Sequence, residues 1–493
     1  MRPLYFFLLF GLTLSILFSS GQIENPDTHL RLTQARIILD DYRFGLPKDV
    51  GEDTHGNIAI NRDGQRYMVY NPGQTIAFIP IYLMVYLIFP NEVTAYYHTA
   101  FFVSFINFFV HALCAFLLFK IALLLSVTKK QAYLASIFFG LTSYSFVFAQ
   151  STYEHHIEMF FILLSTYYAL RNDISQSGFI SGLMLSFGLI FRTTSLLAVP
   201  AVLLIQKDKI ERFKACLSLT LGIVFILLYN YYRFGNPLES GYSLAWSMAH
   251  SDRFDFWSYA GVPAAIIGFL FSPAKGLLFF STTLIFSFAG IKRFREQHSR
   301  IFYAVILISV AYIGAFSLNF AWHGSIWSFG PRYILPIIPF LYLPLVCLEP
   351  PKWIFKILVL TFIFQLELIS VNYKRDVLND FIVCNGISDT KYIYAKNKEP
   401  HLVQAKQLMI IIPKNFRKLN NYMPNSPWKK EIRTASNADV LNFSIEKNSL
   451  NFWWLRIFHL NSSLLIRLIT VIVLLFGFIL AIILYQRVKK EFI

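Results

Sequence analysis

Cysteine and charge are both scarce in this sequence. Four cysteines occur in 493 residues, and without CxxC or Cys/His spacing they indicate neither a disulfide framework nor a structural zinc site. Charged residues make up 15% of the chain, whereas a soluble domain carries roughly 25%. Because 56% of the residues are hydrophobic, water is the wrong solvent for most of the chain.

Long apolar runs recur along the sequence, and many are about 17–25 residues long, enough to cross a hydrocarbon core of about 30 Å as a helix. Much of the excess of Lys and Arg, which gives the net charge of +16, lies in short clusters between these runs. Such clusters mark the cytoplasmic loops of a membrane protein, and their distribution argues against a nucleic-acid partner. The main clusters are Lys129–Lys130, Lys207–Lys214, Lys292–Arg300 and Arg487–Lys490. We therefore predict an all-α polytopic protein embedded in the lipid bilayer.

About twelve transmembrane helices place these clusters on one side and both ends of the chain in the cytoplasm. Residues 3–20 form the first, which is either a cleavable signal peptide or, as the charge pattern favours, a retained anchor. The predicted later crossings are 98–126, 132–149, 159–170, 179–191, 195–205, 214–231, 275–291, 301–319, 334–348, 353–371 and 463–486. Arg192 interrupts an apolar run, and a turn there avoids burying its charge at mid-membrane.

Three other regions complete the predicted organisation. Residues 21–73 form a structured first exoplasmic loop, and 74–90, which contains Pro80, forms a helix at the outer interface. Residues 1–371 make up one transmembrane module, followed by a small soluble exoplasmic insertion at 372–460. A last helix and a cytoplasmic tail occupy 461–493.

The first loop has features beyond those of a connector. Asp27 stands at the start of an irregular amphipathic helix, where a carboxylate is also well placed simply to cap the helix. Asp63-Gly64 lies between two short alternating runs and predicts a tight β-hairpin. The loop ends in Tyr70-Asn71-Pro72-Gly73-Gln74, directly before an apolar helix.

Three later stretches complete a pattern that begins with the first crossing, Asp27 and the sequence from Tyr70 to Gln74. They are Tyr232–Tyr242 (YRFGNPLESGY), Ser272–Leu278 (SPAKGLL), and Phe329–Tyr333 (FGPRY) with Pro336 and Pro339. In this order they resemble the GT-C glycosyltransferases, especially the bacterial relatives of protein O-mannosyltransferases and of the lipid A aminoarabinose transferase. The resemblance covers roughly residues 1–370.

The resemblance implies an enzyme of the inner (plasma) membrane whose active site faces the exoplasmic side. Such an enzyme transfers a sugar, usually with inversion, from a polyprenyl-phosphate-linked donor to an acceptor lipid, glycan or protein. Asp27 matches the position of the family's catalytic carboxylate, which implies the role of general base, with Glu24 as the nearest alternative. Glu154 lies where relatives often carry a second acidic residue.

Other residues are candidates for binding the substrates. A leaving lipid phosphate needs fixed cations, and arginine suits it because its guanidinium can bind two oxygens. The cationic candidates are Arg192, Arg332 and Lys275; the candidates for other substrate contacts are His29, Tyr70, His155 and His323. No cofactor is expected to be required, and no metal ligands are assigned, although Glu and His near 154–158 are compatible with a divalent ion.

Three alternative functions remain open from the sequence. A transporter or flippase of a lipid-linked sugar would explain the helices and Arg192, although no inverted repeat is detectable. An O-antigen ligase or polymerase would depend on 372–460 rather than on Asp27. A non-catalytic membrane scaffold would need none of the acidic residues.

Overall fold

The computed structural model shows a helical protein with several apolar helices. Among the residues that the structure describes, four stretches are long and apolar enough to span a bilayer: Glu92–Leu124, Lys209–Phe234, Ser299–Ser317 and Leu464–Lys490. Six shorter apolar helices accompany them. The chain is therefore a multi-pass membrane protein, whereas the number of twelve crossings stays a prediction. The structure describes residues 3–48, 50, 57–171, 173–249, 261–319, 322–324, 330–349, 351, 353–371, 400–415, 449–459 and 463–492.

The centre of the molecule is a bundle built around α1 (Pro3–Phe18). This helix packs against α5 (Ile106–Leu124) and α25 (Leu464–Phe492). Aromatic rings fill the contact, as Phe7 lies 6.1 Å from Tyr133 and 5.7 Å from Phe119 between ring centroids. The first apolar segment is thus part of the folded core. The bundle also contains α4 (Glu92–Val103), α6 (Lys129–Thr142), α7 (Tyr144–Phe148) and α8 (His155–Leu170).

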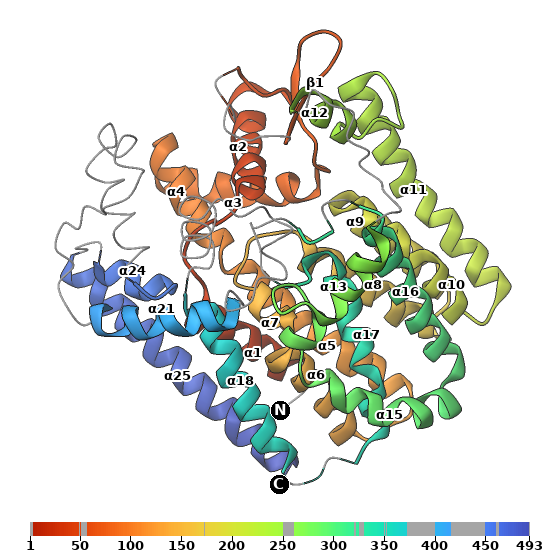
Figure 1. Ribbon diagram of the computed structural model, residues 1–493. Coiled ribbons are helices and arrows are strands. Elements are labelled where there is room, and N and C mark those ends of the chain that lie inside the picture. The colour runs from red at the N-terminus through yellow and green to blue at the C-terminus, as the bar shows by residue number, and fades with distance from the viewer. Residues whose placement is uncertain are drawn as a thin grey trace.

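At one end, the top of Figure 1, lies a unit made from the segment after α1. It contains α2 (Pro26–Asp41), the hairpin of β1 (Ile58–Ile60) and β2 (Arg66–Met68), and α3 (Gly73–Ile88). Ile58 pairs with Met68 in an antiparallel register, and Gly64 supplies the left-handed turn with φ +76°, as the Asp63-Gly64 pattern predicts. Both ends of the chain lie toward the opposite end of the molecule.

Arg233 fixes this hairpin to the transmembrane bundle. It lies near the end of α11 (Lys209–Phe234), where its Nη1 donates to the carbonyl of Met68 at 2.6 Å. Its guanidinium stacks on Tyr229 at 4.0 Å from the ring centroid. Arg233, within a motif that resembles the GT-C family, therefore has a structural role here. Next along the described chain comes α12 (Tyr242–Ala249), which contacts β1.

The chain breaks at Arg192, as the sequence predicts. α9 (Ser177–Phe191) ends there in extended backbone, φ −147° and ψ 126°, and the 3₁₀ helix η1 (Thr193–Ala198) and α10 (Val199–Ile205) follow. The amide of Gly178, at the start of α9, donates to Glu211, at the start of α11. Both helices begin at the same end of the bundle and pack side by side. The segment of η1 and α10 therefore leads the chain from the end of α9 back to the start of α11.

The predicted crossing at 275–291 begins too early. Residues up to Gly276 form a turn after α13 (Val262–Phe271), a helix that the sequence interpretation did not assign. A single turn, α14 (Leu277–Phe280), ends at Ser281, and the helix proper is α15 (Leu284–Gln297). The turn arises because the side chain of Ser272 accepts the amides of Ala274 and Lys275, both at 3.2 Å. α16 (Ser299–Ser317) follows.

Proline shapes the predicted crossing at 334–348. It is made of η2 (Arg332–Ile337), α17 (Ile338–Leu341) and η3 (Leu343–Cys347). Pro336, Pro339 and Pro344 each lack an amide hydrogen, so no long regular α-helix forms. The region 372–460 lies largely outside the described residues, apart from α21 (Pro400–Asn415) and α24 (Trp453–His459). α18 (Ile354–Ser370) precedes it.

Candidate active site

The start of α2 is held by a residue other than Asp27. The side chain of Asn25 accepts the amide of Thr28 at 2.8 Å, so Asn25 is the N-cap. Its amide also donates to the hydroxyl of Thr152 at 2.9 Å, which fastens α2 to the turn before α8. The interpretation of Asp27 as the helix cap is therefore wrong. Asp27 is the second residue of α2, and it is half-buried.

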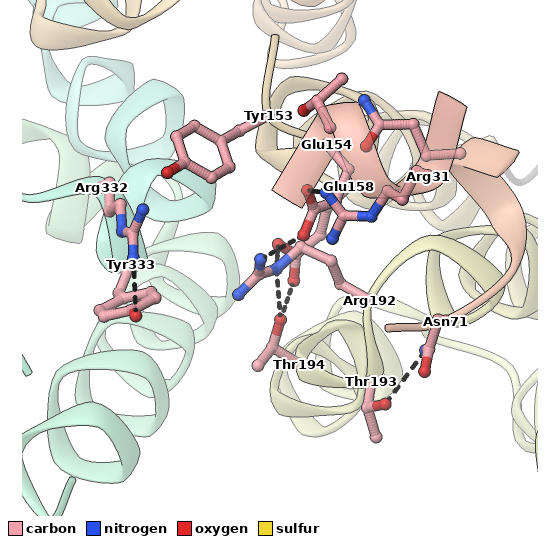
Figure 2. Close-up of polar contacts among 12 residues, drawn as sticks. Arg31, Asn71, Tyr153, Glu154, Glu158, Arg192, Thr193, Thr194, Arg332 and Tyr333 are labelled. Atoms are coloured by element: carbon pink, nitrogen blue, oxygen red, sulfur yellow. Dashed lines mark hydrogen bonds and ion pairs between the residues drawn. The ribbon is translucent and has the colours of Figure 1, made fainter. Parts of the chain in front are cut away.

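The sequence from Tyr70 to Gln74 joins three parts of the site. Tyr70 lies under Arg31, whose guanidinium is 4.0 Å from the ring centroid. Asn71 donates to the carbonyl of Leu189 at 2.8 Å and to the hydroxyl of Thr193 at 3.1 Å, across the break at the end of α9 (Figure 2). Gln74 donates to the carbonyl of Thr152 at 2.7 Å. This motif holds α2, α9 and the turn before α8 in one place.

Glu154 is the centre of a buried ionic group. Arg31 reaches one of its carboxylate oxygens at 2.8 Å, and Arg192 reaches the other at 2.6 Å (Figure 2). Only 5% of the Glu154 side chain is exposed, so burial opposes its ionisation. The two guanidinium groups outweigh that effect and hold the pKa of Glu154 below its usual value. Glu154 is therefore charged, with a guanidinium group beside each of its oxygens.

Arg192 also pairs with a second carboxylate. Its Nε lies 3.0 Å from Glu158, and Glu158 in turn accepts hydrogen bonds from Thr194 at 2.5 Å and Tyr312 at 2.8 Å. The broken helix thus places a cation between two acids, which offset its charge. A role of Arg192 in binding donor phosphate stays a prediction, because here its partners are carboxylates.

Arg332 forms a second polar group on the other side of Tyr153 (Figure 2). Its guanidinium stacks on Tyr153 at 4.9 Å and on Tyr333 at 4.8 Å, and Nη2 donates to the Tyr333 hydroxyl at 3.0 Å. The buried Nε and Nη1 have no hydrogen-bond partner among the described residues, and neither ring nitrogen of the buried His155 has one. Buried donors are normally satisfied, so these groups indicate a place for a polar ligand.

Asp27 acts electrostatically on residues of both groups. Burial raises the pKa of Tyr70, and the Asp27 carboxylate raises it further. The same carboxylate acts electrostatically on Arg31 and, on the other side, on Tyr153 and Arg332. The fold therefore gathers residues from α2, the turn before α8 and η2 around one acidic side chain.

Two further candidates lie on the Arg332 side. The buried Lys275 follows α13 in a turn whose Ala274 carbonyl accepts the amide of Gly330 at 3.0 Å. Burial, which is the largest cause, and the positive charges of Lys275 and Arg332 lower the pKa of His323 to about 3. His323 is consequently neutral at physiological pH.

His29 and Glu24 face elsewhere. His29 shares a hydrogen bond with the Tyr96 hydroxyl at 2.9 Å and contacts the Ile23 carbonyl at 3.1 Å, so it ties α2 to α4. Glu24 accepts from Asn451 at 2.8 Å, near α24. The structure does not bring these two residues to the group around Asp27.

Arg31 is a residue of the candidate site that sequence reasoning missed. It stands four positions after Asp27 on α2, so both lie on one helix face, and that spacing could have indicated it. Among the described residues no group of three or more His, Cys, Asp or Glu side chains is arranged to hold a metal ion.

Fold and site together define a multi-pass helical membrane protein with a buried ionic centre at the end that carries the hairpin. No protein-family model and no curated protein matches the chain. Solved structures do show similarity. One is ArnT from Cupriavidus metallidurans bound to undecaprenyl phosphate, with 10% identity, a TM-score of 0.45, and coverage of 90% of this chain and 74% of ArnT.

Two other solved structures give comparable values. The apo state of the same ArnT has 12% identity and a TM-score of 0.45, over 84% of this chain and 79% of ArnT. The oligosaccharyltransferase AglB from Archaeoglobus fulgidus, in complex with an inhibitory peptide and a dolichol-phosphate, has 11% identity and a TM-score of 0.42. That match covers 90% of this chain and 59% of AglB. These are distant likenesses.

Proposed function

We propose that this protein is a membrane glycosyltransferase that moves a sugar from a polyprenyl-phosphate-linked donor to an acceptor on the exoplasmic face. The observation that carries the proposal is the position of Asp27. Asp27 does not cap α2, is half-buried, and acts electrostatically both on Arg31, which pairs with Glu154, and on Arg332, whose Nε and Nη1 have no partner among the described residues. A base beside an anion-binding group is what displacement of a sugar phosphate requires.

In the proposed reaction, Asp27 takes the proton of an acceptor hydroxyl. The acceptor oxygen forms a bond to the anomeric carbon while the bond from that carbon to the phosphate oxygen breaks. The electron pair leaves with the polyprenyl phosphate, and attack from the opposite side inverts the anomeric centre. A positioned base of this kind contributes about 10²–10⁴-fold to the rate.

Arg332 and His155 are the groups we assign to the leaving phosphate. The unpartnered Nε and Nη1 of Arg332 provide a charged donor pair, and His155 adds a ring nitrogen nearby. The aromatic rings of Tyr153 and Tyr333 exclude water there, which strengthens the attraction of a cation for developing negative charge. Lys275 adds a further positive charge on this side.

Glu154 then has a positioning role rather than a direct one. Each of its oxygens lies beside a guanidinium group, 2.8 Å from Arg31 and 2.6 Å from Arg192. These charges favour the ionised carboxylate, which makes Glu154 a weak base for a substrate proton. Its ion pair holds Arg31 one helical turn after Asp27. We therefore infer that Glu154, Arg31 and Arg192 keep the face of α2 that carries Asp27 in place.

The test is sugar transfer by purified full-length protein from a series of polyprenyl-phosphate sugars. Asp27→Asn should lower kcat by at least about 10²-fold with little change in donor KM. Asp63→Asn is the matched control, because Asp63 is exposed on the hairpin turn and should leave turnover unchanged. Unaltered turnover in Asp27→Asn would remove the proposal.

A second variant separates donor binding from proton transfer. Arg332→Gln removes a charged donor pair and should raise donor KM roughly tenfold or more. Arg62→Gln, exposed on the hairpin, is its control. If the KM for every donor is unchanged in Arg332→Gln, the phosphate does not bind where we place it.

A transporter of a lipid-linked sugar is the second candidate. The broken helix at Arg192 and the paired charges of Glu154 and Glu158 favour it, since transporters use interrupted helices and internal ion pairs at their binding sites. It predicts translocation of the lipid by protein in liposomes without sugar transfer, and equal activity of wild type and Asp27→Asn.

A further inference from the structure

An apolar groove runs along the outside of the bundle, and none of the residues that line it belongs to the candidate active site. It encloses about 210 Å³ and is bounded by α1, α6, α18 and α25. Its walls include Phe10, Leu14, Phe355, Phe362 and Leu484, and nearly every lining atom is apolar. A cavity with such walls does not hold water and takes up hydrocarbon readily.

The length of the groove matches a lipid chain of one leaflet. Its lining residues on α1 extend from Phe6 to Phe18, which spans roughly 18 Å at 1.5 Å per residue. One leaflet contributes about half of a hydrocarbon core that is about 30 Å thick. The groove therefore accommodates one acyl chain lying parallel to the helices.

One end of the groove carries positive charge. Phe355 and Tyr485, both lining residues, bring the start of α18 and the last turns of α25 together, with ring centroids 6.0 Å apart. Beside these residues stand Lys356 on α18 and Lys489 and Lys490 on α25, all exposed. In Figure 1 both helices run to the end of the molecule where the chain terminates.

We propose that this groove is a binding site for an anionic phospholipid, with one acyl chain between α18 and α25 and the headgroup at Lys356, Lys489 and Lys490. An anionic headgroup is favoured because lysines at the membrane surface attract negatively charged lipids. The site is separate from the proposed transfer reaction, since its lining residues are distinct from those around Asp27.

Native mass spectrometry of delipidated full-length protein tests this, with phosphatidylglycerol and phosphatidylcholine of identical acyl chains. Wild type should retain phosphatidylglycerol preferentially. In the double variant Lys356→Gln/Lys489→Gln, the preference for phosphatidylglycerol over phosphatidylcholine should fall roughly tenfold. The matched control is Lys207→Gln/Lys209→Gln, since these exposed lysines also lie in a basic cluster but stand on neither α18 nor α25.

A groove-filling variant tests the acyl chain itself. Ala481→Trp places a large ring in the groove and should reduce retention of phosphatidylglycerol, while thermal unfolding confirms that the protein is folded. Equal retention of both lipids by wild type, or equal losses in the two double variants, would overturn the proposal. Retention of polyprenyl phosphate in place of phosphatidylglycerol would also overturn it, because the occupant would then be an isoprenoid.

Discussion

At the scale of single residues, the buried pairs of Glu154 are the most consequential contacts near the site. Two charges removed from water gain little net stability by pairing, but breaking such a pair leaves the partner buried and uncompensated. Arg31 is 2% exposed and Arg192 is 15% exposed, so neither can be rehydrated easily. Loss of Glu154 should therefore affect folding as well as activity.

We expect Glu154→Gln to lower the free energy of unfolding by roughly 3 kcal/mol, measured by thermal unfolding in detergent. The effect should depend on pH. Because the folded protein lowers the pKa of Glu154, its stabilisation is complete above the ordinary Glu pKa of about 4.3 and is lost as the pH falls below it. The difference between wild type and Glu154→Gln should accordingly shrink at acidic pH.

The control for this variant is Glu92→Gln. Glu92 pairs with Arg36 at 3.7 Å, and its side chain is 61% exposed, so the change should stay within about 1 kcal/mol. If the two variants are equally stable at neutral pH, the Glu154 network does not hold the site together.

Single residues also show what the sequence can reveal. Asn25 and Asp27 are both good capping residues, and only the backbone decided that Asn25 caps, with φ −125° and ψ 143°. The pairing of Arg31 with Glu154 joins positions 123 apart in the chain, so no local pattern specifies it. His29 looked like a site residue because of its neighbours, yet the rotation of α2 turns it toward α4.

At the scale of elements, breaks in helices were predictable when charge or proline caused them. A lone arginine inside an apolar run specified the end of α9, because burial of the charge is costly. The late start of α15 was not predictable, since it depends on Ser272 accepting two nearby amides. Whether 74–90 lies at the interface stays a prediction, although α3 packs on α2 and α4.

The contact of α9 with α11 gives a prediction at this scale. Both helices approach closely because Gly182 has no side chain: a Cβ there would lie 2.0 Å from the Ala215 carbonyl oxygen. Small residues allow such contacts in membranes. Gly182→Ala should force the helices apart and cost about 1–3 kcal/mol, measured as a lower unfolding temperature.

Gly314→Ala is the matched control for that helix contact. Gly314 lies inside α16, and nothing stands within 4 Å of a Cβ built there. Alanine favours the helix at such a position, so the variant should be as stable as wild type or slightly more so. Equal destabilisation by both substitutions would mean that the α9–α11 contact is not tightly packed.

At the scale of the whole molecule, the ends of the bundle differ. The hairpin, α2 and the candidate active site gather at one end, whereas both chain termini lie toward the other (Figure 1). This arrangement agrees with the proposal that the lipid-linked sugar donor binds on one side of the membrane while the basic loops face the other side. The basic clusters between the apolar runs predicted that the two ends of the bundle differ. Which residues make up the candidate site could be seen only in the folded structure, because they come from distant parts of the chain.

The last prediction concerns the orientation of the protein in the membrane. Asp63→Cys, in a background with Cys216 and Cys384 replaced by Ser, should react with a membrane-impermeant thiol reagent in intact cells, since Asp63 is exposed on the hairpin turn. Lys209→Cys in the same background should react only after the membrane is opened. The reverse pattern would place Asp27 on the cytoplasmic side, where an exoplasmic transfer reaction cannot occur, although the groove beside α25 would still bind lipid.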